Sequence, residues 1–231
     1  MAISANQLEV LYEDNHLLVV NKRAMLPTMG VSEDQPSLIK IAKEYIREKY
    51  QKPGNVFLGV VSRLDAPVTG VTLLARTSKA AARLSAAFRD RKVRKSYLAV
   101  VAGEVPDASG TLEHYLRKDE RHRKVHVTHA DCPDAQLARL RYRVLKVSAG
   151  KSLLEIELET GRKHQIRVQL AKLGFPIVGD KKYGSQQNFF KGIALHAREL
   201  EISHPTLDKT ITFTAPMPRY WLESPSFAGL F

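Results

Sequence analysis

Cysteine is nearly absent from this chain, since Cys132 is the only one among 231 residues. A single thiol excludes an internal disulfide and suits a reducing compartment, so we expect a cytoplasmic protein. The sequence also has no apolar run of transmembrane length, and its first residues lack the basic-then-apolar pattern of a secretory signal peptide. We therefore expect no membrane partner.

Signatures of nucleotide cofactors and of serine nucleophiles are absent as well. The chain has no Gly-x-x-x-x-Gly-Lys-Ser/Thr loop, no Gly-x-Gly-x-x-Gly turn and no Gly-x-Ser-x-Gly elbow. Cys132 lies between Asp131 and Pro133 in a polar stretch, which is typical of an incidental thiol. No repeat, low-complexity tract or linker divides the chain, so we expect one domain over residues 1–231.

The chain has fewer acidic residues than basic ones. There are 24 Asp and Glu against 36 Lys and Arg, which gives a formal net charge of +12. An excess of this size indicates a polyanionic partner, and nucleic acid is the one we expect. Hydrophobic residues make up 44% of the chain, which is enough for a sizeable core and argues against global disorder.

Hydrophobic periodicity and turn residues predict a mixed α+β domain. The expected strands are Leu8–Tyr12, His16–Asn21, Phe57–Val61, Val71–Ala75, Tyr97–Val101, Leu137–Val147, Ser152–Glu159, Ile193–Ile202 and Thr210–Thr214. The expected helices run from Pro36 to about Tyr50, from Thr77 or Ser78 onward, and over His164–Leu173 with Gly174 closing the last one. The polar stretch from Gly110 to Pro133, with its basic run Arg117–Lys124, is expected to be a loop.

The segment between the third and fourth expected strands is the most informative one. Arg63 and Asp65 are two residues apart, so they point to the same side of an extended chain. A carboxylate and a guanidinium at the mouth of a buried strand pair are costly unless they have a partner or a function. The competing interpretation is a surface loop in which Asp65 caps a turn.

Cations gather where the last expected helix begins. Arg162, Lys163 and His164 precede its apolar stripe, and cations at this end oppose the helix dipole. An anion bound there would offset that cost, whereas a solvated helix end remains the alternative. Arg167 lies one turn into the helix, where partial burial would let it meet a carboxylate from elsewhere. Tyr97 opens a strand, and we expect either a core residue with its hydroxyl at the rim or a stacking face for a base.

A histidine-rich stretch is the one candidate for a metal site. His122, His126, His129 and Cys132 are loosely spaced, whereas zinc motifs usually bring their ligands closer in pairs. A solvated basic loop is the interpretation that we favour, so we expect no metal.

Taken together, these pieces resemble the RluA-type family of pseudouridine synthases. The similarity covers nearly the whole chain, and five motifs occur in the family's order. They are Tyr12–Lys22, Ser62–Gly70, Arg94–Ala99, Thr160–Arg167 followed by Gly174–Asp180, and Leu195–Ala197 with His204, Pro205, Ala215 and Pro216. The chain departs from the family pattern at Arg23, Ser62 and Ala66.

The resemblance implies an α+β pseudouridine-synthase-like domain with a mixed, mostly antiparallel sheet, flanking helices and a central active-site cleft. It implies an isomerase that converts a specific uridine of structured RNA, ribosomal or transfer, into pseudouridine without cofactor or metal. Asp65 matches the catalytic aspartate, Tyr97 the active-site tyrosine and Arg167 the arginine that pairs with the aspartate. Arg63 matches the residue associated with base flipping.

Further RNA contacts are expected at Lys22, Arg162, Lys163 and His164. We expect a monomer that consists of the catalytic domain without an N-terminal S4-like module. Two alternatives stay open, a catalytically inactive RNA-binding protein of the same fold and a hydrolase of nucleoside bonds. The products made from RNA would distinguish them, since the three hypotheses predict pseudouridine, no change or free uracil.

Overall fold

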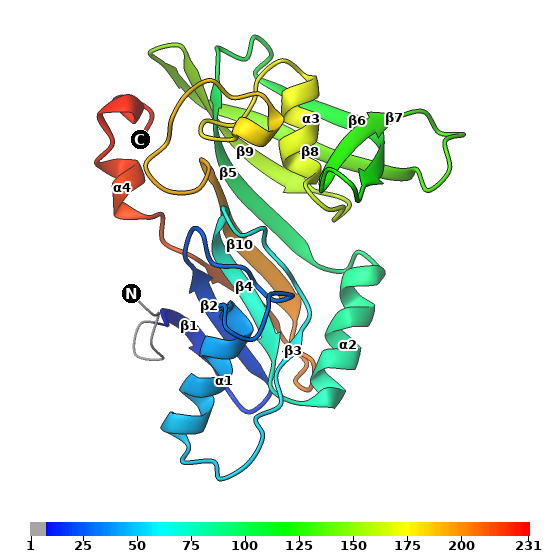
Figure 1. Cartoon of the computed structure of the whole chain (residues 1–231), viewed down its shortest axis with the longest axis vertical. Coiled ribbons are helices and arrows are strands. Elements are labelled where there is room, and N and C mark those ends of the chain that lie inside the picture. Colours follow the sequence, from blue (N-terminus) through cyan, green and yellow to red (C-terminus); the bar gives the residue numbers. More distant parts are fainter. Residues whose placement is uncertain (1–7) are drawn as a thin grey trace. The chain divides into compact units, whose positions relative to one another are not determined.

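The computed structural model describes residues 8–231 and divides the chain into two compact units. Unit 1 contains the described residues up to Val93 together with Ala197–Pro216, and unit 2 contains Arg94–His196 and Met217–Phe231. Figure 1 shows the helices and strands of each unit. The expectation of one catalytic domain over residues 1–231 stays a prediction.

Unit 1 is built on a sheet whose strand order is β1 (Val10–Glu13), β2 (Leu17–Lys22), β4 (Thr69–Ala75) and β10 (Leu195–Ser203, in this unit from Ala197 onward). The short strand β3 (Gly59–Val60) pairs with β4, and β11 (Thr210–Thr214) pairs with β10, both antiparallel. β2 also runs antiparallel to β1 and to β4. The predicted strands Leu8–Tyr12, His16–Asn21, Ile193–Ile202 and Thr210–Thr214 are confirmed, with shifted ends, as β1, β2, β10 and β11.

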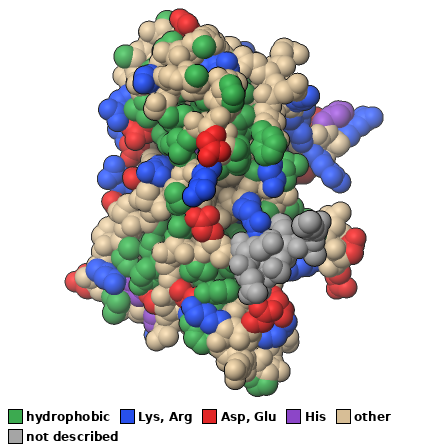
Figure 2. Space-filling view, turned by 90° about the vertical axis from the view of Figure 1, so that its left-hand side faces the viewer, with side chains coloured by type: hydrophobic (Ala, Val, Ile, Leu, Met, Phe, Trp, Pro, Cys, Tyr) green, Lys and Arg blue, Asp and Glu red, His purple; other side chains and the backbone are tan. Residues whose placement is uncertain are grey.

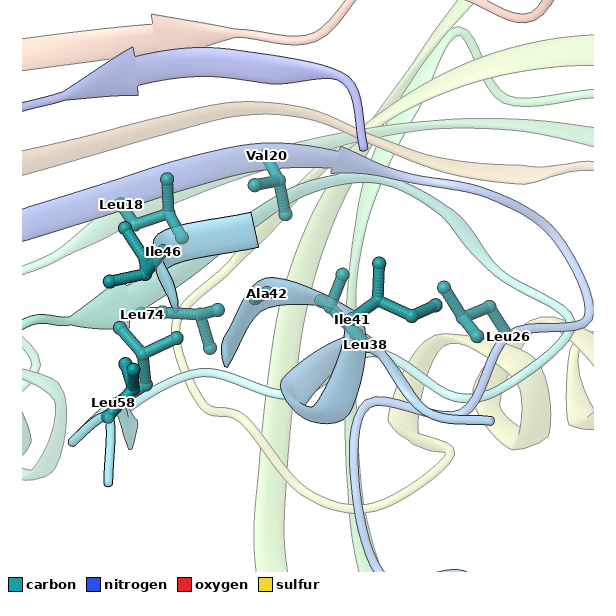
Figure 3. Packing of buried hydrophobic residues seen from close by; sticks show 10 residues of the cluster. Leu18, Val20, Leu26, Leu38, Ile41, Ala42, Ile46, Leu58 and Leu74 are labelled. Atoms are coloured by element: carbon teal, nitrogen blue, oxygen red, sulfur yellow. The ribbon is translucent and has the colours of Figure 1, made fainter. Parts of the chain in front are cut away.

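Two helices complete unit 1. α1 (Leu38–Lys49) contributes Leu38, Ile41, Ala42 and Ile46 to a core that also contains Leu18 and Val20 of β2 and Leu74 of β4 (Figure 3). α2 (Ser78–Arg89) begins at Thr77, whose hydroxyl accepts the backbone N–H of Ala80 at 3.2 Å. Both helices were predicted, because their apolar residues recur every three or four positions.

Unit 2 is an antiparallel sheet with strand order β5 (Arg94–Ala102), β9 (Lys151–Leu158), β8 (Gln136–Ser148), β6 (Ser109–Asp119) and β7 (Lys124–Thr128). α3 (Gln165–Lys172) packs against β6 and β7, next to the short 3-10 helix η2 (Lys181–Tyr183). The chain ends in α4 (Arg219–Leu222) and η3 (Pro225–Phe227), which bring Trp221 and Phe227 against Phe189.

The loop predicted from Gly110 to Pro133 is wrong, because β6 and β7 occupy most of it. Leu112, Leu116 and Val125 are buried, while the side chains between them are exposed and mostly polar. A strand with one solvent-exposed face has only about half the apolar residues of a fully buried strand, so its composition resembles that of a loop. The α+β class, with antiparallel strands and flanking helices in each unit, is confirmed.

Candidate active site

The Asp65 loop connects β3 to β4 in unit 1. Its turn is closed by the Val68 N–H, which donates to the Asp65 carbonyl oxygen at 3.1 Å. Just before the turn, the hydroxyl of Ser62 accepts the backbone N–H of Leu73 at 3.2 Å, which ties the loop back to β4. Asp65 is half-buried and Arg63 is exposed. The carboxylate therefore sits on a short loop whose two ends are both attached to one strand.

A threonine from a distant segment holds the residue before Asp65. The Thr28 hydroxyl donates to the Leu64 carbonyl oxygen at 2.9 Å and accepts the Leu64 N–H at 3.2 Å. Thr28 is only 4% exposed. A buried hydroxyl that satisfies both backbone groups of one residue restricts the backbone of that residue. Thr28 thus orients the peptide that leads into Asp65.

Lys22 holds the residue after Asp65. Its ammonium group donates to the carbonyl oxygens of Ala66 at 3.2 Å, Leu26 at 2.8 Å and Arg23 at 3.0 Å. Burial lowers the pKa of Lys22 to about 7, while the charge of Asp65 acts in the opposite direction and raises it. The structure gives no support to the predicted RNA contact of Lys22, because its side chain is 1% exposed and its three bonds go to the backbone.

The far end of the loop is held by a close backbone contact. Gly70 has a φ of +115°, and a Cβ built on it would lie 2.2 Å from the Ala197 carbonyl oxygen on β10. Only glycine fits a position with both this conformation and this approach. The sequence of unit 1 therefore fixes Asp65 through four separate contacts, at Ser62, Thr28, Lys22 and Gly70.

In unit 2, Tyr97 and α3 lie on the same face of the sheet. Tyr97 on β5 is opposite Ile156 on β9, which in turn is opposite Tyr142 on β8. Strand residues that pair directly share a face, and alternation along β8 extends that face to Ala138. Ala138 packs against Val168 of α3. The strand register thus brings Tyr97 to the face that carries Arg167.

Arg167 forms an ion pair that the sequence analysis did not identify. Its Nε and Nη2 donate to Asp180 Oδ2 at 2.7 Å and Oδ1 at 2.9 Å, and the two side chains are 6% and 1% exposed. The guanidinium group also lies over the ring of Tyr183, 5.0 Å from its centroid. The sequence predicted that Arg167 is buried and contacts a carboxylate, and the structure places both with Asp180. The pairing of Arg167 with Asp65 stays a prediction.

Tyr183 connects the start of α3 to the β6–β7 hairpin. Its hydroxyl accepts the Val125 N–H at 3.0 Å and lies 2.7 Å from Nδ1 of His164. His164 has a φ of 54°, in the left-handed region, and precedes the first residue of the helix. Because Tyr183 also stacks on Arg167, one side chain orders both the helix start and the buried guanidinium.

The cations at the start of α3 differ in their surroundings. Arg162 is half-buried, and its Nε donates to the Leu137 carbonyl oxygen at 3.0 Å, while Lys163 is exposed. Gln165 Oε1 accepts the backbone N–H of Arg162 at 3.0 Å and the Thr160 hydroxyl at 2.8 Å. The roles predicted for Arg162, Lys163 and His164 in RNA binding remain predictions.

The histidine-rich stretch belongs to the β6–β7 hairpin and the turn after it. His122 Nδ1 and His126 Nε2 lie 2.7 and 3.6 Å from Asp119 Oδ2. Among residues 8–231, no group of three or more His, Cys, Asp or Glu side chains is placed to hold a metal ion. Within the same residues, no helix combines the length and apolar character needed to cross a membrane.

Three site residues escaped the sequence analysis, namely Thr28, Asp180 and Tyr183. Asp180 ends the Gly174–Asp180 motif, so a signal for it was present, but its partner was not evident from spacing. Thr28 and Tyr183 act through contacts 36 and 58 residues away in the chain, with Leu64 and Val125. Figure 2 shows Lys and Arg side chains scattered over the face in view, so surface charge alone does not locate the site.

Comparison with known proteins identifies related chains. Residues 16–172 match the RNA pseudouridylate synthase family. An uncharacterized RNA pseudouridine synthase of Bacillus subtilis, YhcT, is 34% identical over 218 residues, which span 92% of this chain and 69% of that protein. Ribosomal large subunit pseudouridine synthase C of Rickettsia prowazekii is 34% identical over 215 residues, which span 92% of this chain and 69% of that protein.

A solved structure agrees with these matches. Human RNA pseudouridylate synthase domain containing 4 superposes with a TM-score of 0.81 at 26% sequence identity, covering 98% of this chain and 95% of that one. Of the motifs described above, Ser62–Gly70, Arg94–Ala99 and Thr160–Arg167 lie within the residues that match the family, 16–172.

Proposed function

The chain belongs to the RNA pseudouridylate synthase family, an isomerase family that acts on RNA, and we propose that Asp65 is the carboxylate on which its chemistry depends. The observation that supports this proposal is the set of hydrogen bonds that hold the backbone on both sides of Asp65. Thr28 binds the backbone of the residue before it, and Lys22 binds the carbonyl of the residue after it. A loop held this closely keeps a carboxylate in one orientation.

The reaction breaks the N1–C1′ glycosidic bond of uridine, turns the uracil and forms a bond from C5 to C1′. A proton leaves C5 and N1 gains one, so nothing is added or oxidised overall. One carboxylate is sufficient, either as a nucleophile that attacks C1′ or as a base that opens a glycal route. We therefore propose that no metal and no organic cofactor take part, and that chelation by EDTA leaves the activity intact.

Two residues of unit 2 complete the proposed chemistry. Tyr97 stacks on the uracil and shares in removing the C5 proton. Arg167 keeps Asp65 ionised and oriented through charge-assisted hydrogen bonds. The buried pair with Asp180 supports this role, because it holds the Arg167 guanidinium in one orientation. The apolar side chain of Leu64, which precedes Asp65, excludes water, which would turn isomerisation into hydrolysis.

The RNA must release the target base from its stack, at a cost of roughly a few kcal/mol. Arg63 is exposed beside Asp65 and fills the space that the base leaves. Arg162, Lys163 and His164 contact the backbone near the target and contribute affinity that offsets the cost. The relatives named as ribosomal large subunit synthases favour a uridine of large-subunit ribosomal RNA over one of transfer RNA. We propose that the protein acts as a monomer in the cytoplasm.

The test compares the wild type with Asp65→Asn on unmodified, transcribed large-subunit ribosomal RNA and on transfer RNA, both labelled with tritium at uridine C5. We expect tritium release by the wild type from ribosomal RNA, none by Asp65→Asn, and equal RNA affinity for the two. Turnover by Asp65→Asn would overturn its assignment. Free uracil would indicate a hydrolase, and release from transfer RNA alone would reassign the substrate.

A further inference from the structure

Four arginines on one face of the unit 2 sheet pair with glutamates on the same face. Arg139, Arg141 and Arg143 alternate along β8, beside Glu155, Glu157 and Glu159 at the end of β9. The pairs Arg141–Glu157, Arg143–Glu155 and Arg139–Glu159 have N–O distances of 3.3, 2.8 and 3.1 Å. Arg94 on β5 joins Glu157 at 3.5 Å, and Glu113 on β6 lies 3.6 Å from Arg139. Four arginines therefore face four glutamates, and we call this set the arginine ladder.

The opposite face of the same sheet has a different charge. Leu112, Leu116 and Ala138 alternate with the ladder residues, so they point to the face that α3 covers. Lys118 continues this series at the end of β6 and is exposed. The four arginines of the ladder are thus balanced by glutamates, while the cations on the α3 face have no such ladder.

Three segments that are distant in the chain meet on the α3 face. The Lys182 ammonium group of η2 donates to the Arg123 carbonyl oxygen in the β6–β7 turn at 3.0 Å. The Tyr183 hydroxyl joins Val125 of β7 to His164 at the start of α3. Around these contacts lie five exposed cations, which we call the five-cation surface: Lys118, Arg123, Lys163, Lys181 and Lys182.

Asp180 and Asp119, two of the acidic groups near this surface, have other partners, while a third, Glu120, is exposed in the β6–β7 turn. Asp180, which precedes η2, is 1% exposed and pairs with Arg167, and Asp119 in the hairpin lies beside His122 and His126. Within residues 8–231, none of the five cations forms an ion pair with a carboxylate. Because their charge is not balanced locally, it is available to an anionic ligand.

We propose that the five-cation surface binds the phosphate backbone of the RNA that flanks the target uridine, and that the arginine ladder takes no part in RNA binding. This inference rests on the proposed function, since it takes RNA as the ligand. The surface contains Lys163, which is predicted to contact RNA, together with cations of the β6–β7 turn and of η2. The five-cation surface also surrounds Tyr183, whose ring lies against the buried Arg167 guanidinium. Tyr183 therefore contacts both Arg167 and the segments that bind the RNA backbone.

Two double variants that each remove two positive charges test the proposal. Lys163→Ala/Lys181→Ala alters the five-cation surface, and Arg141→Ala/Arg143→Ala alters the ladder. Binding of transcribed large-subunit ribosomal RNA is measured over a salt series. Each lost phosphate contact reduces the slope of log K against log salt by roughly 0.7 to 0.9. We expect a reduction of about 1.4 to 1.8 for the first variant, and an unchanged slope for the second and for Lys163→Arg/Lys181→Arg.

Equal slope changes in the two alanine variants would overturn the proposal, because charge alone would then explain affinity. Tighter binding of anionic phosphatidylglycerol vesicles than of RNA, lost in the first variant, would assign the surface to a membrane instead. Circular dichroism confirms that each variant is folded. If tritium release shows no isomerisation by the wild type, the proposed function fails, while the salt series still decides which face binds RNA.

Discussion

The guanidinium of Arg167 is bound by Asp180 through two hydrogen bonds, Nε to Oδ2 at 2.7 Å and Nη2 to Oδ1 at 2.9 Å. Both side chains are almost completely buried, so each charge depends on the other for compensation. The arginine that we expect to orient Asp65 is therefore itself oriented by a second carboxylate, 13 residues later in the chain. This arrangement leads to the first two predictions.

Asp180→Asn should destabilise the protein strongly. Removing one partner of a buried ion pair typically costs about 3–5 kcal/mol, because the other charge remains buried. Arg143→Ala is the matched control, since its pair with Glu155 is exposed and should contribute less than about 1 kcal/mol. Urea unfolding of the two variants provides the comparison. Similar midpoints for Asp180→Asn and the wild type would show that the pair contributes little.

Arg167→Ala should abolish most of the isomerisation rate at saturating RNA, because Asp65 loses the cation that we propose for it. Arg167→Lys should rescue the rate only in part, since an ammonium group cannot form the planar two-bond contact. Single-turnover rates and RNA affinities, measured side by side, separate the possible roles. A variant with weaker affinity but an intact saturated rate would make Arg167 a phosphate ligand.

Substitutions of Tyr183 should separate the contributions of its hydroxyl and its ring. Tyr183→Phe removes the hydrogen bonds to Val125 and His164 and should cost about 1 kcal/mol of stability for each. Its ring remains under Arg167, so most of the saturated rate should be retained. Tyr183→Leu also removes the cation–π contact and should lower the rate further. Equal rates for Phe and Leu would show that the ring does not position Arg167.

Thr28→Val should lower the reaction rate more than RNA affinity. The two side chains have nearly the same shape, but valine leaves the N–H and carbonyl of Leu64 without the hydroxyl, at a cost of about 1–3 kcal/mol. Thr28→Ser keeps the hydroxyl and should retain most of the rate. Rates at saturating RNA, together with unfolding midpoints, check both expectations. A Thr28→Val protein that is destabilised but fully active would restrict Thr28 to a structural role.

Lys22 should make stability depend on pH. Burial lowers its pKa from the ordinary value of 10.5 to about 7, so between these values the unfolded chain binds a proton that the folded chain does not. The free energy of unfolding should therefore rise with pH above about 7 in the wild type, relative to Lys22→Met. Lys40→Met is the control, because the Lys40 ammonium group also donates to three carbonyl oxygens, but at the surface.

Urea unfolding of these proteins at pH values between about 7 and 9 measures the effect, which appears as a difference in slope between wild type and Lys22→Met. Lys40→Met should follow the wild type. Parallel curves for all three proteins would show that Lys22 remains charged in the folded state throughout this range.

Much of the fold follows from local sequence. The stripe of Leu38, Ile41 and Tyr45 predicted α1, and the apolar runs Leu137–Val147 and Ser152–Glu159 predicted β8 and β9. Ala149 and Gly150, which both have positive φ, form the tight turn between these two strands. The motif around Asp65 identified the family. In each of these cases the signal comes from residues close together in the chain, where backbone preference and periodicity act directly.

The hairpin β6–β7 and the partners of the site depended on tertiary structure. Leu116 and Val125 became core residues only because Val168 of α3 covers them. An RNA contact was predicted for Lys22, but its side chain is buried and its ammonium group binds backbone carbonyl oxygens. Thr28 binds Leu64, which lies 36 residues later in the chain, and Arg167 binds Asp180, which lies 13 residues later. Local sequence specifies which side chains are available, whereas packing decides which are buried, and burial decides which charges require a partner.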